Sequence, residues 1–177
     1  MTARPTESEI VELFANSDPD QVWIKVSEII ARINPNYDNR LIHTVFIDVI
    51  SLFRGEYPGY SSIKTLYHDM PHTLDVLMCA ARLMNGLHLS GMQFSDDEIS
   101  LILIAVLMHD IGYAQLQGEE SGTGAQYTQT HVKRGITFME YYLEKRHIPQ
   151  DFAIKLAPMI TITDPALIAV DIEFPDD

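Results

Sequence analysis

The sequence predicts an all-α fold, a compact helical bundle. Apolar residues recur at helical spacing in several long segments, loop signals rich in glycine and proline separate them, and no segment alternates strictly between apolar and polar residues. The chain has 177 residues and is 46% hydrophobic, which suits a globular domain with a real core. We expect one domain over 1–177, with N-terminal helices in 1–55 and a motif-bearing core in 60–165.

Local signals place helices along the first part of the chain. A short amphipathic helix is predicted over 7–14. The next helix begins after Asp18, a favourable N-cap residue, and has Pro19 at its first position. A third helix is predicted over 39–54 and is ended by Gly55, because glycine readily adopts the left-handed conformation of a helix C-terminus.

The middle of the chain contains two further helix signals. One helix is predicted over about 71–85 and stops at Gly86. Another opens with Ser95 and Glu98, which have the spacing of a capping box, and is closed by Gly112.

The remaining residues alternate between loop and helix signals. Residues 114–130 are rich in Gln, Gly, Ser and Thr and are predicted to form a mobile loop. Helices are predicted over 131–147 and 150–162. Few strands are expected anywhere in the chain.

The charge of the chain restricts its partners. The net charge is −13, from 25 acidic and 12 basic residues. Such a surface repels nucleic acid and anionic lipid, so neither is expected as a partner. It would also repel a small phosphorylated, nucleotide-like substrate unless a local positive charge is present, and a divalent metal ion would supply one.

Two features bear on the compartment. The N-terminus lacks the basic start and apolar core of a signal peptide, and the longest apolar run, 99–108, is too short to span a membrane. We therefore expect a cytoplasmic protein. The single cysteine, Cys79, excludes an intramolecular disulfide and lies in an apolar run, so we expect it in the core.

Histidine and aspartate occur together in the segment YHDMPH at 67–72. Its proline suits a first helical turn, so His68 lies just before a helix and His72 lies inside the first turn. Asp69 is either the N-cap of this helix or a group that supports a neighbouring polar site. Asp75, on the same face as His72, is either an exposed acid that complements the helix dipole or a partner that orients His72.

A second pair, His109 and Asp110, follows an almost entirely apolar helix in the segment LMHDIGY. Burying an imidazole and a carboxylate there is unfavourable unless they are paired or bound to a cation. Imidazole nitrogen and carboxylate oxygen suit zinc, manganese or iron, and magnesium with added waters. The two pairs therefore predict either polar helix ends or one metal site.

The other histidines and motifs give weaker indications of function. We interpret His43, His88 and His147 as structural or surface residues, with His88 in a loop and His147 near a helix C-terminus, where a cation is favourable. The glycine-rich segment GEESGTGA lacks the Lys-Ser or Lys-Thr of a phosphate loop. No serine lies in the context of a nucleophile elbow.

The two histidine motifs, in this order, resemble the HD-domain superfamily of metal-dependent phosphohydrolases, and most closely its cyclic-nucleotide phosphodiesterase branch. That branch carries Tyr-His-Asn, two residues, His and then Asp-Val, with His-Asp later at a helix end. The matching residues are Tyr67, His68, His72, Asp75, Val76, His109 and Asp110. Weaker matches extend the resemblance over about 60–165, through His131, Gly135, Ile160, Thr163 and Asp164.

The resemblance implies a helical bundle of the HD-domain type that holds a divalent ion of Mn, Mg, Zn or Fe. The implied metal ligands are His72, His109 and Asp110. His68 would be the general acid that protonates the leaving oxygen.

The resemblance carries weaker implications at other positions. His131 and Asp164 would lie near a second metal or its bound waters, whereas Asp69 replaces the usual asparagine of the family and has no clear role. The fourth ligand of the family is an aspartate on a helix well downstream of the Thr-Asp segment, and thirteen residues follow Asp164 here. Asp164 or Asp171 would have to replace it, or the chain is a fragment or a shortened member. A chain shortened in this way would expose apolar surface, which would favour a homo-oligomer.

Together these features predict a metal-dependent phosphohydrolase that hydrolyses a phosphoester or nucleotide with metal-activated water. Two alternatives stay open. One is a degenerate HD domain that binds a metal or nucleotide and regulates a partner without turnover. The other is a helical interaction module whose histidines are structural.

Overall fold

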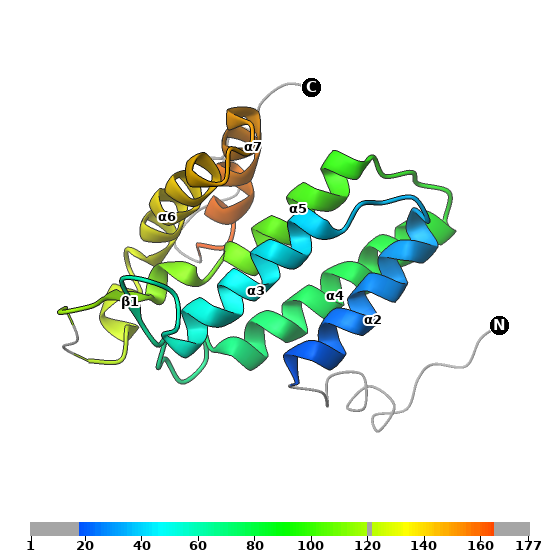
Figure 1. Cartoon of the computed structure of the whole chain (residues 1–177). Helices are drawn as coiled ribbons and strands as arrows, with labels where there is room; N and C mark the ends of the chain where they lie inside the picture. The colour runs from blue at the N-terminus through cyan, green and yellow to red at the C-terminus, as the bar shows by residue number, and fades with distance from the viewer. Residues whose placement is uncertain (1–17, 120–121, 165–177) are drawn as a thin grey trace.

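The computed structural model describes residues 18–119 and 122–164, which form an all-α bundle, as predicted (Figure 1). Its helices are α2 (Pro19–Ile33), α3 (Arg40–Arg54), α4 (Met70–Leu89), α5 (Asp96–Met108), α6 (His131–Lys145) and α7 (Gln150–Thr161). Between them lie the 3₁₀-helices η1 (Ile111–Tyr113) and η2 (Ala125–Tyr127) and the strands β1 (Tyr60–Ser61) and β2 (Gln115–Leu116). The helix predicted over 7–14 and the candidate Asp171 lie outside the described residues.

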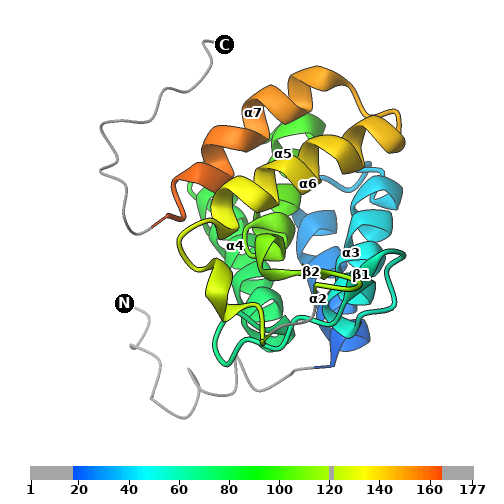
Figure 2. The same ribbon diagram turned by 90° about the vertical axis from the view of Figure 1, so that its left-hand side faces the viewer.

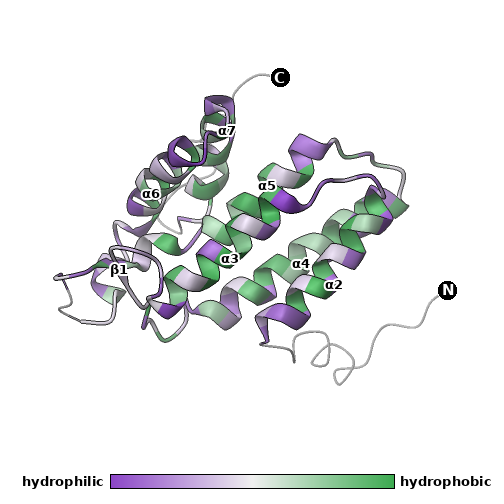
Figure 3. Ribbon diagram, viewed as in Figure 1, coloured by the Kyte–Doolittle hydropathy of each residue, from purple (hydrophilic) through white to green (hydrophobic). Residues whose placement is uncertain are grey.

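Helix α5 lies at the centre of the bundle. It contacts α3, α4 and α7, while α2 packs on α4 and α6 packs on α7 (Figures 1 and 2). Most of its residues are buried, which is the pattern of a helix that is apolar on all sides. The outer helices α3 and α6 carry both hydrophobic and hydrophilic residues, as expected of helices with one buried face (Figure 3).

The predicted helix caps are confirmed. The side chain of Asp18 accepts a hydrogen bond from the backbone N–H of Asp20. Gly55 ends α3 with a φ of 75°, in the left-handed region. Ser95 and Glu98 form both hydrogen bonds of the capping box at the start of α5. Each of the N-terminal caps satisfies a backbone donor that the helix leaves unpaired, which is worth about 1 kcal/mol.

Two predicted helix ends are wrong. Helix α4 continues through Gly86 to Leu89, so His88 lies in the last turn and not in a loop. A glycine inside a helix costs only about 1 kcal/mol, and the packing of α4 on α2 and α5 outweighs that cost. Helix α5 ends at Met108, and Gly112 lies within η1 instead of closing α5.

The prediction that Cys79 lies in the core is also wrong, because this side chain is exposed. Helix α4 buries Leu74, Leu77, Met78 and Ala81, which share one face. Position 79 lies about 140° around the helix from Leu74, on the opposite face. Apolar residues on both sides of it in the sequence hide this orientation.

The segment predicted as a loop over 114–130 contains β2 and η2. Strand β2 pairs antiparallel with β1, with Tyr60 opposite Leu116 and Ser61 opposite Gln115 (Figure 2). This two-stranded ribbon ties the connection between α3 and α4 to the residues that follow η1. The mobility of the segment stays a prediction. Within the described residues, no helix is long and apolar enough to cross a membrane.

Candidate metal centre

The start of α4 positions the first two histidines. The side chain of Asp69 caps this helix and accepts a hydrogen bond from the backbone N–H of His72 at 2.9 Å. The hydroxyl of Thr65 donates to the carbonyl oxygen of His68, which holds the preceding residues in place. His68 therefore lies just before α4 and His72 lies in its first turn, as predicted, and Asp69 has the capping role.

The end of α5 supplies the second pair. His109 follows the last residue of α5, and Asp110 precedes η1. The Asp110 side chain is only 3% exposed. A carboxylate so deeply buried requires compensating partners, because transfer of a bare charge out of water is very unfavourable.

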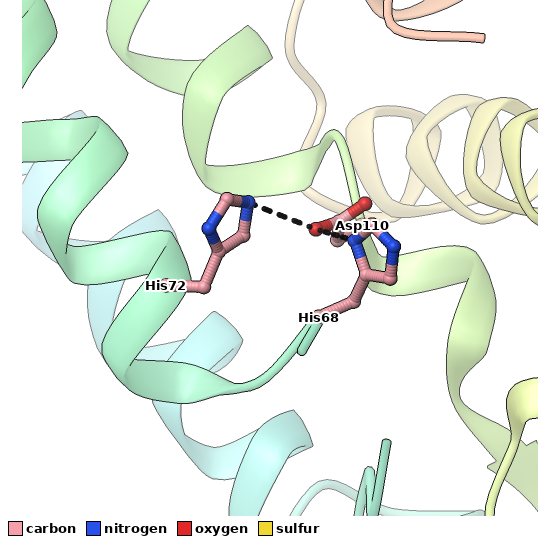
Figure 4. Close-up of side chains that lie close together, drawn as sticks. All are labelled: His68, His72 and Asp110. Atoms are coloured by element: carbon pink, nitrogen blue, oxygen red, sulfur yellow. Dashed lines mark hydrogen bonds and ion pairs between the residues drawn. The ribbon is translucent and has the colours of Figure 1, made fainter. Parts of the chain in front are cut away.

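Three imidazoles surround the Asp110 carboxylate. Asp110 Oδ2 lies 2.8 Å from His68 Nδ1, 3.0 Å from His109 Nε2 and 3.5 Å from His72 Nε2. Figure 4 shows the rings of His68 and His72 directed at this oxygen from either side. The two sequence motifs, far apart in the chain, are thus brought to one point, and His72 Nε2 and His109 Nε2 lie 3.4 Å apart.

The tautomer of His109 makes this arrangement chemically informative. Its Nδ1 lies 2.7 Å from the carbonyl oxygen of Val106, which can only accept a hydrogen bond. Nδ1 therefore carries the proton, and in the neutral ring the lone pair of Nε2 points toward the Asp110 oxygen. Two acceptors this close repel each other unless a proton or a cation lies between them. The donor set thus fits a shared cation.

The pKa values of His109 and Asp110 reflect the same repulsion between two acceptor atoms. Burial would lower the pKa of His109, but the hydrogen bond to Asp110, the charge of Asp110 and the hydrogen bond to Val106 together outweigh burial and raise the pKa above the ordinary value. Burial would raise the pKa of Asp110, but the contacts with His109 and His68 lower it overall. Burial lowers the pKa of His72, which favours the neutral form that binds metals. Either a proton or a metal ion between His109 Nε2 and Asp110 Oδ2 would therefore remove this repulsion.

The metal-ligating atoms of His68, His72 and Asp110 all lie within 4.8 Å of one another, so this group could hold a metal ion. His68 was expected to act as the general acid and not as a ligand. Its Nδ1 instead contacts the same Asp110 oxygen as the predicted ligands. His68 therefore has two candidate roles, and a metal measurement on a variant distinguishes them.

Tyr113 joins this group, although the sequence did not single it out. Its buried ring stacks on His68 with 4.6 Å between centroids and on His131 with 4.5 Å. His131 donates from Nδ1 to the carbonyl oxygen of Thr128, which leaves its Nε2 free of the proton when the ring is neutral. The position of Tyr113, three residues after Asp110 in LMHDIGY, was the available signal.

The structure also places the remaining candidates. Burial raises the pKa of Tyr113 and a hydrogen bond with Thr128 lowers it, while the charges of Asp110 and Asp164 raise it further, so the Asp164 carboxylate acts on Tyr113 electrostatically. Burial raises the pKa of Asp75, and no hydrogen bond among the described residues joins it to His72. An orienting role for Asp75 therefore lacks direct contact.

The other three histidines lie outside the group around Asp110. His43 stacks on Trp23 of α2 with 4.7 Å between ring centroids. His147 follows the C-terminus of α6 with a φ of 55°. Within the described ranges, the group that could hold a metal includes neither of them, nor His88.

Comparison with known proteins matched no family model, no curated protein and no solved structure.

Proposed function

We propose that this chain is a metal-dependent phosphohydrolase of the HD-domain type that acts on a phosphoester or nucleotide. One observation carries the proposal: a single buried carboxylate oxygen, on Asp110, faces the nitrogens of His68, His72 and His109. The resemblance of the two motifs to the HD-domain superfamily supports the reaction class.

The residues present fit a divalent transition metal. His72, His109 and Asp110 would hold it, with His68 as either a fourth ligand or the general acid. Three imidazoles and one carboxylate suit zinc, manganese or iron better than magnesium, which prefers oxygen. When bound, such an ion would polarise the phosphoryl group and lower the pKa of a water molecule.

The side chains around the group have their own tasks. The His68 side chain is 34% exposed, the most accessible of the three imidazoles, and can reach a ligand that enters from solvent. The buried ring of Tyr113 fixes the plane of His68 by stacking on it. An imidazole held in this way can donate a proton to a leaving oxygen, a step typically worth about 10²- to 10⁴-fold in rate.

The electrostatic setting supports a metal in this role. The chain carries a net charge of −13, which opposes the approach of a phosphate ester. A divalent ion at Asp110 would reverse the sign of the field at that point. Without it, the buried carboxylate would repel the substrate directly.

The test is metal analysis of the dialysed 177-residue chain, together with hydrolysis of bis(p-nitrophenyl) phosphate and p-nitrophenyl phosphate. We expect bound metal, hydrolysis that EDTA abolishes, and recovery on addition of Mn²⁺ or Zn²⁺. The His109→Ala variant should lose both metal and activity. The exposed His147→Asn variant, whose new residue tolerates the same positive φ, is the matched control and should keep both. Hydrolysis that persists equally in His109→Ala would refute the proposal.

A regulatory domain without turnover is the second candidate. It is favoured by the presence of only one carboxylate in the group that could hold a metal, within the described residues. In that case the chain would bind metal through His109 but hydrolyse none of the esters.

A further inference from the structure

A cavity borders η1 and is lined by none of the metal-centre histidines. It has a volume of about 1070 Å³ and runs along α6, bounded by the end of α3, by β1 and β2 and by η1. We call it the α6 groove. The metal-centre residues His68, His72, His109 and Asp110 do not line the α6 groove. Ile111, Gly112 and Ala114, which follow Asp110, do line it. The groove is therefore a separate site from the metal centre.

Positive charge is concentrated in the α6 groove. Four of the chain's 12 basic residues line it, against two acidic ones, in a chain whose net charge is −13. The basic residues are Lys133, Arg134, Lys145 and Arg146, and the acidic ones are Asp48 and Glu56. Of the acids, Asp48 is already satisfied by Arg146 and by the hydroxyl of Tyr142. The groove is thus an exception to the anion-repelling surface of the chain.

The basic end near Lys133 coincides with the N-terminus of α6. This end of a helix carries a partial positive charge, and it usually attracts acidic residues. Here the first turn of α6 contains no acidic residue, the N-cap Thr130 forms no side-chain capping bond, and Lys133 and Arg134 add positive charge. Thr130 and Lys133 both line the groove. Cations placed at the positive end of a helix are unfavourable by themselves and become favourable when an anion binds between them.

The cations are held in different ways. Arg134 donates to the carbonyl oxygens of Gly112 and Ala114 and lies over the ring of Tyr127, so its guanidinium has a fixed position. Lys133 is exposed, and no ion pair among the described residues involves it. A fixed guanidinium and an ammonium group that line the same cavity are suited to binding a phosphate or carboxylate.

Aromatic side chains form the body of the groove. Phe138 meets Tyr57 and Tyr60 edge-on, with ring centroids 5.7 and 5.4 Å apart. The Tyr141 side chain, one turn further along α6, is 55% exposed and also lines the cavity. An exposed aromatic ring offers a face on which a flat apolar group can stack.

We propose that the α6 groove binds a small planar aromatic anion, with its anionic group at Lys133 and Arg134 and its ring against Tyr141 and Tyr57. A nucleoside phosphate has this chemistry, with a phosphate group and a flat base. Because η1 forms one wall of the groove and directly follows Asp110, a ligand here would contact the segment that positions the metal centre.

The test is isothermal titration of the metal-free full chain with AMP, adenosine and inorganic phosphate. We expect AMP to bind more tightly than either fragment, and binding to weaken as salt rises. Lys133→Gln and Tyr141→Ala should each weaken AMP binding about fivefold or more. The matched controls Lys25→Gln on α2 and Leu83→Ala on α4, both at exposed positions, should leave it unchanged.

The same titration separates this site from the metal centre. His109→Ala should retain AMP binding in the groove, whatever its effect on hydrolysis. Equal affinity for AMP and adenosine, no AMP binding, loss of binding in His109→Ala, or unchanged binding in both groove variants would each overturn the inference. None of these outcomes depends on whether the chain hydrolyses esters.

Discussion

The backbone of Gly112 lies directly against the carbonyl of His131, so that a Cβ atom at position 112 would come within 1.8 Å of that oxygen. This contact joins η1, which follows Asp110, to the first turn of α6. Arg134 reinforces it by donating to the carbonyl oxygens of Gly112 and Ala114. The metal centre and the start of α6 therefore share one tightly packed junction.

Gly112→Ala should destabilise the protein and disturb the metal centre, because backbone atoms and not a flexible side chain would have to move. We expect a loss of about 2 kcal/mol or more in the free energy of unfolding, measured with urea. Gly86→Ala is the matched control. It lies inside α4 with nothing within 4 Å of the added Cβ, and it should raise stability by about 0.5 to 1 kcal/mol. Equal effects of the two substitutions would contradict the close packing of Gly112.

His68→Ala distinguishes the two roles of this histidine. If His68 donates a proton, the variant should retain metal and lose about 10²- to 10⁴-fold in turnover of phosphodiesters. Its loss should be smaller for p-nitrophenyl esters, whose leaving group needs little protonation. Metal analysis of His72→Ala provides the comparison, because loss of metal in both variants to the same extent would make His68 a ligand.

The pH dependence of stability in the metal-free chain should reflect the pair of His109 and Asp110. The folded-state pKa of His109 lies above its reference of 6.5, so its stabilising contribution is complete below that pH and is lost as pH rises through the raised pKa. The pKa of Asp110 lies below 3.8 in the folded state, so its contribution is lost only as pH falls through that lower pKa. His109→Gln should therefore cost more stability near pH 5.5 than near pH 9.

Urea unfolding in EDTA at the two pH values measures this difference. His72, whose pKa is lowered, contributes to the pH dependence in the opposite direction. A cost of His109→Gln that does not vary with pH would show that the pair is not charged in the metal-free chain. Added Zn²⁺ should release protons as it binds, because it competes for the same nitrogen.

Tyr142→Phe tests the link between α3 and α6. The Tyr142 hydroxyl donates to Asp48 Oδ2 at 2.6 Å, and Asp48 also pairs with Arg146. Burial, together with the hydrogen bond to Asp48, strongly raises the pKa of Tyr142, so the hydroxyl stays protonated and keeps donating. We expect a loss of about 1.5 kcal/mol in the free energy of unfolding. Tyr141→Phe, one residue along on the exposed side of α6, should change stability by less than about 0.5 kcal/mol.

The helices and their caps could be predicted from sequence because the signals are local. Asp18 and the Ser95–Glu98 box each act within one turn of the helix they begin, and the structure shows both. The end of α4 could not be predicted in this way. Gly86 has the residue type of a helix terminator, but contacts with α2 and α5, distant in sequence, carry the helix past it.

Part of the candidate metal centre could also be predicted from the sequence. The resemblance of the two motifs to the HD-domain superfamily implied that His72, His109 and Asp110 converge, and the structure brings them together. The orientation of His68 toward the same oxygen depends on the loop before α4, which no spacing rule describes. The stacking of Tyr113 between His68 and His131 depends on how η1 packs on α6, a tertiary contact with no periodic signal.

The exposed Cys79 gives the chain a built-in attachment point for a spectroscopic label. It is the only cysteine in the sequence, so a maleimide or methanethiosulfonate reagent would modify one defined position without any engineering. Cys79 is seven residues beyond His72 on α4, about 10 Å along the helix axis. A nitroxide there would lie close enough to Mn²⁺ at His72 for its electron paramagnetic resonance signal to broaden, so metal occupancy could be followed without turnover.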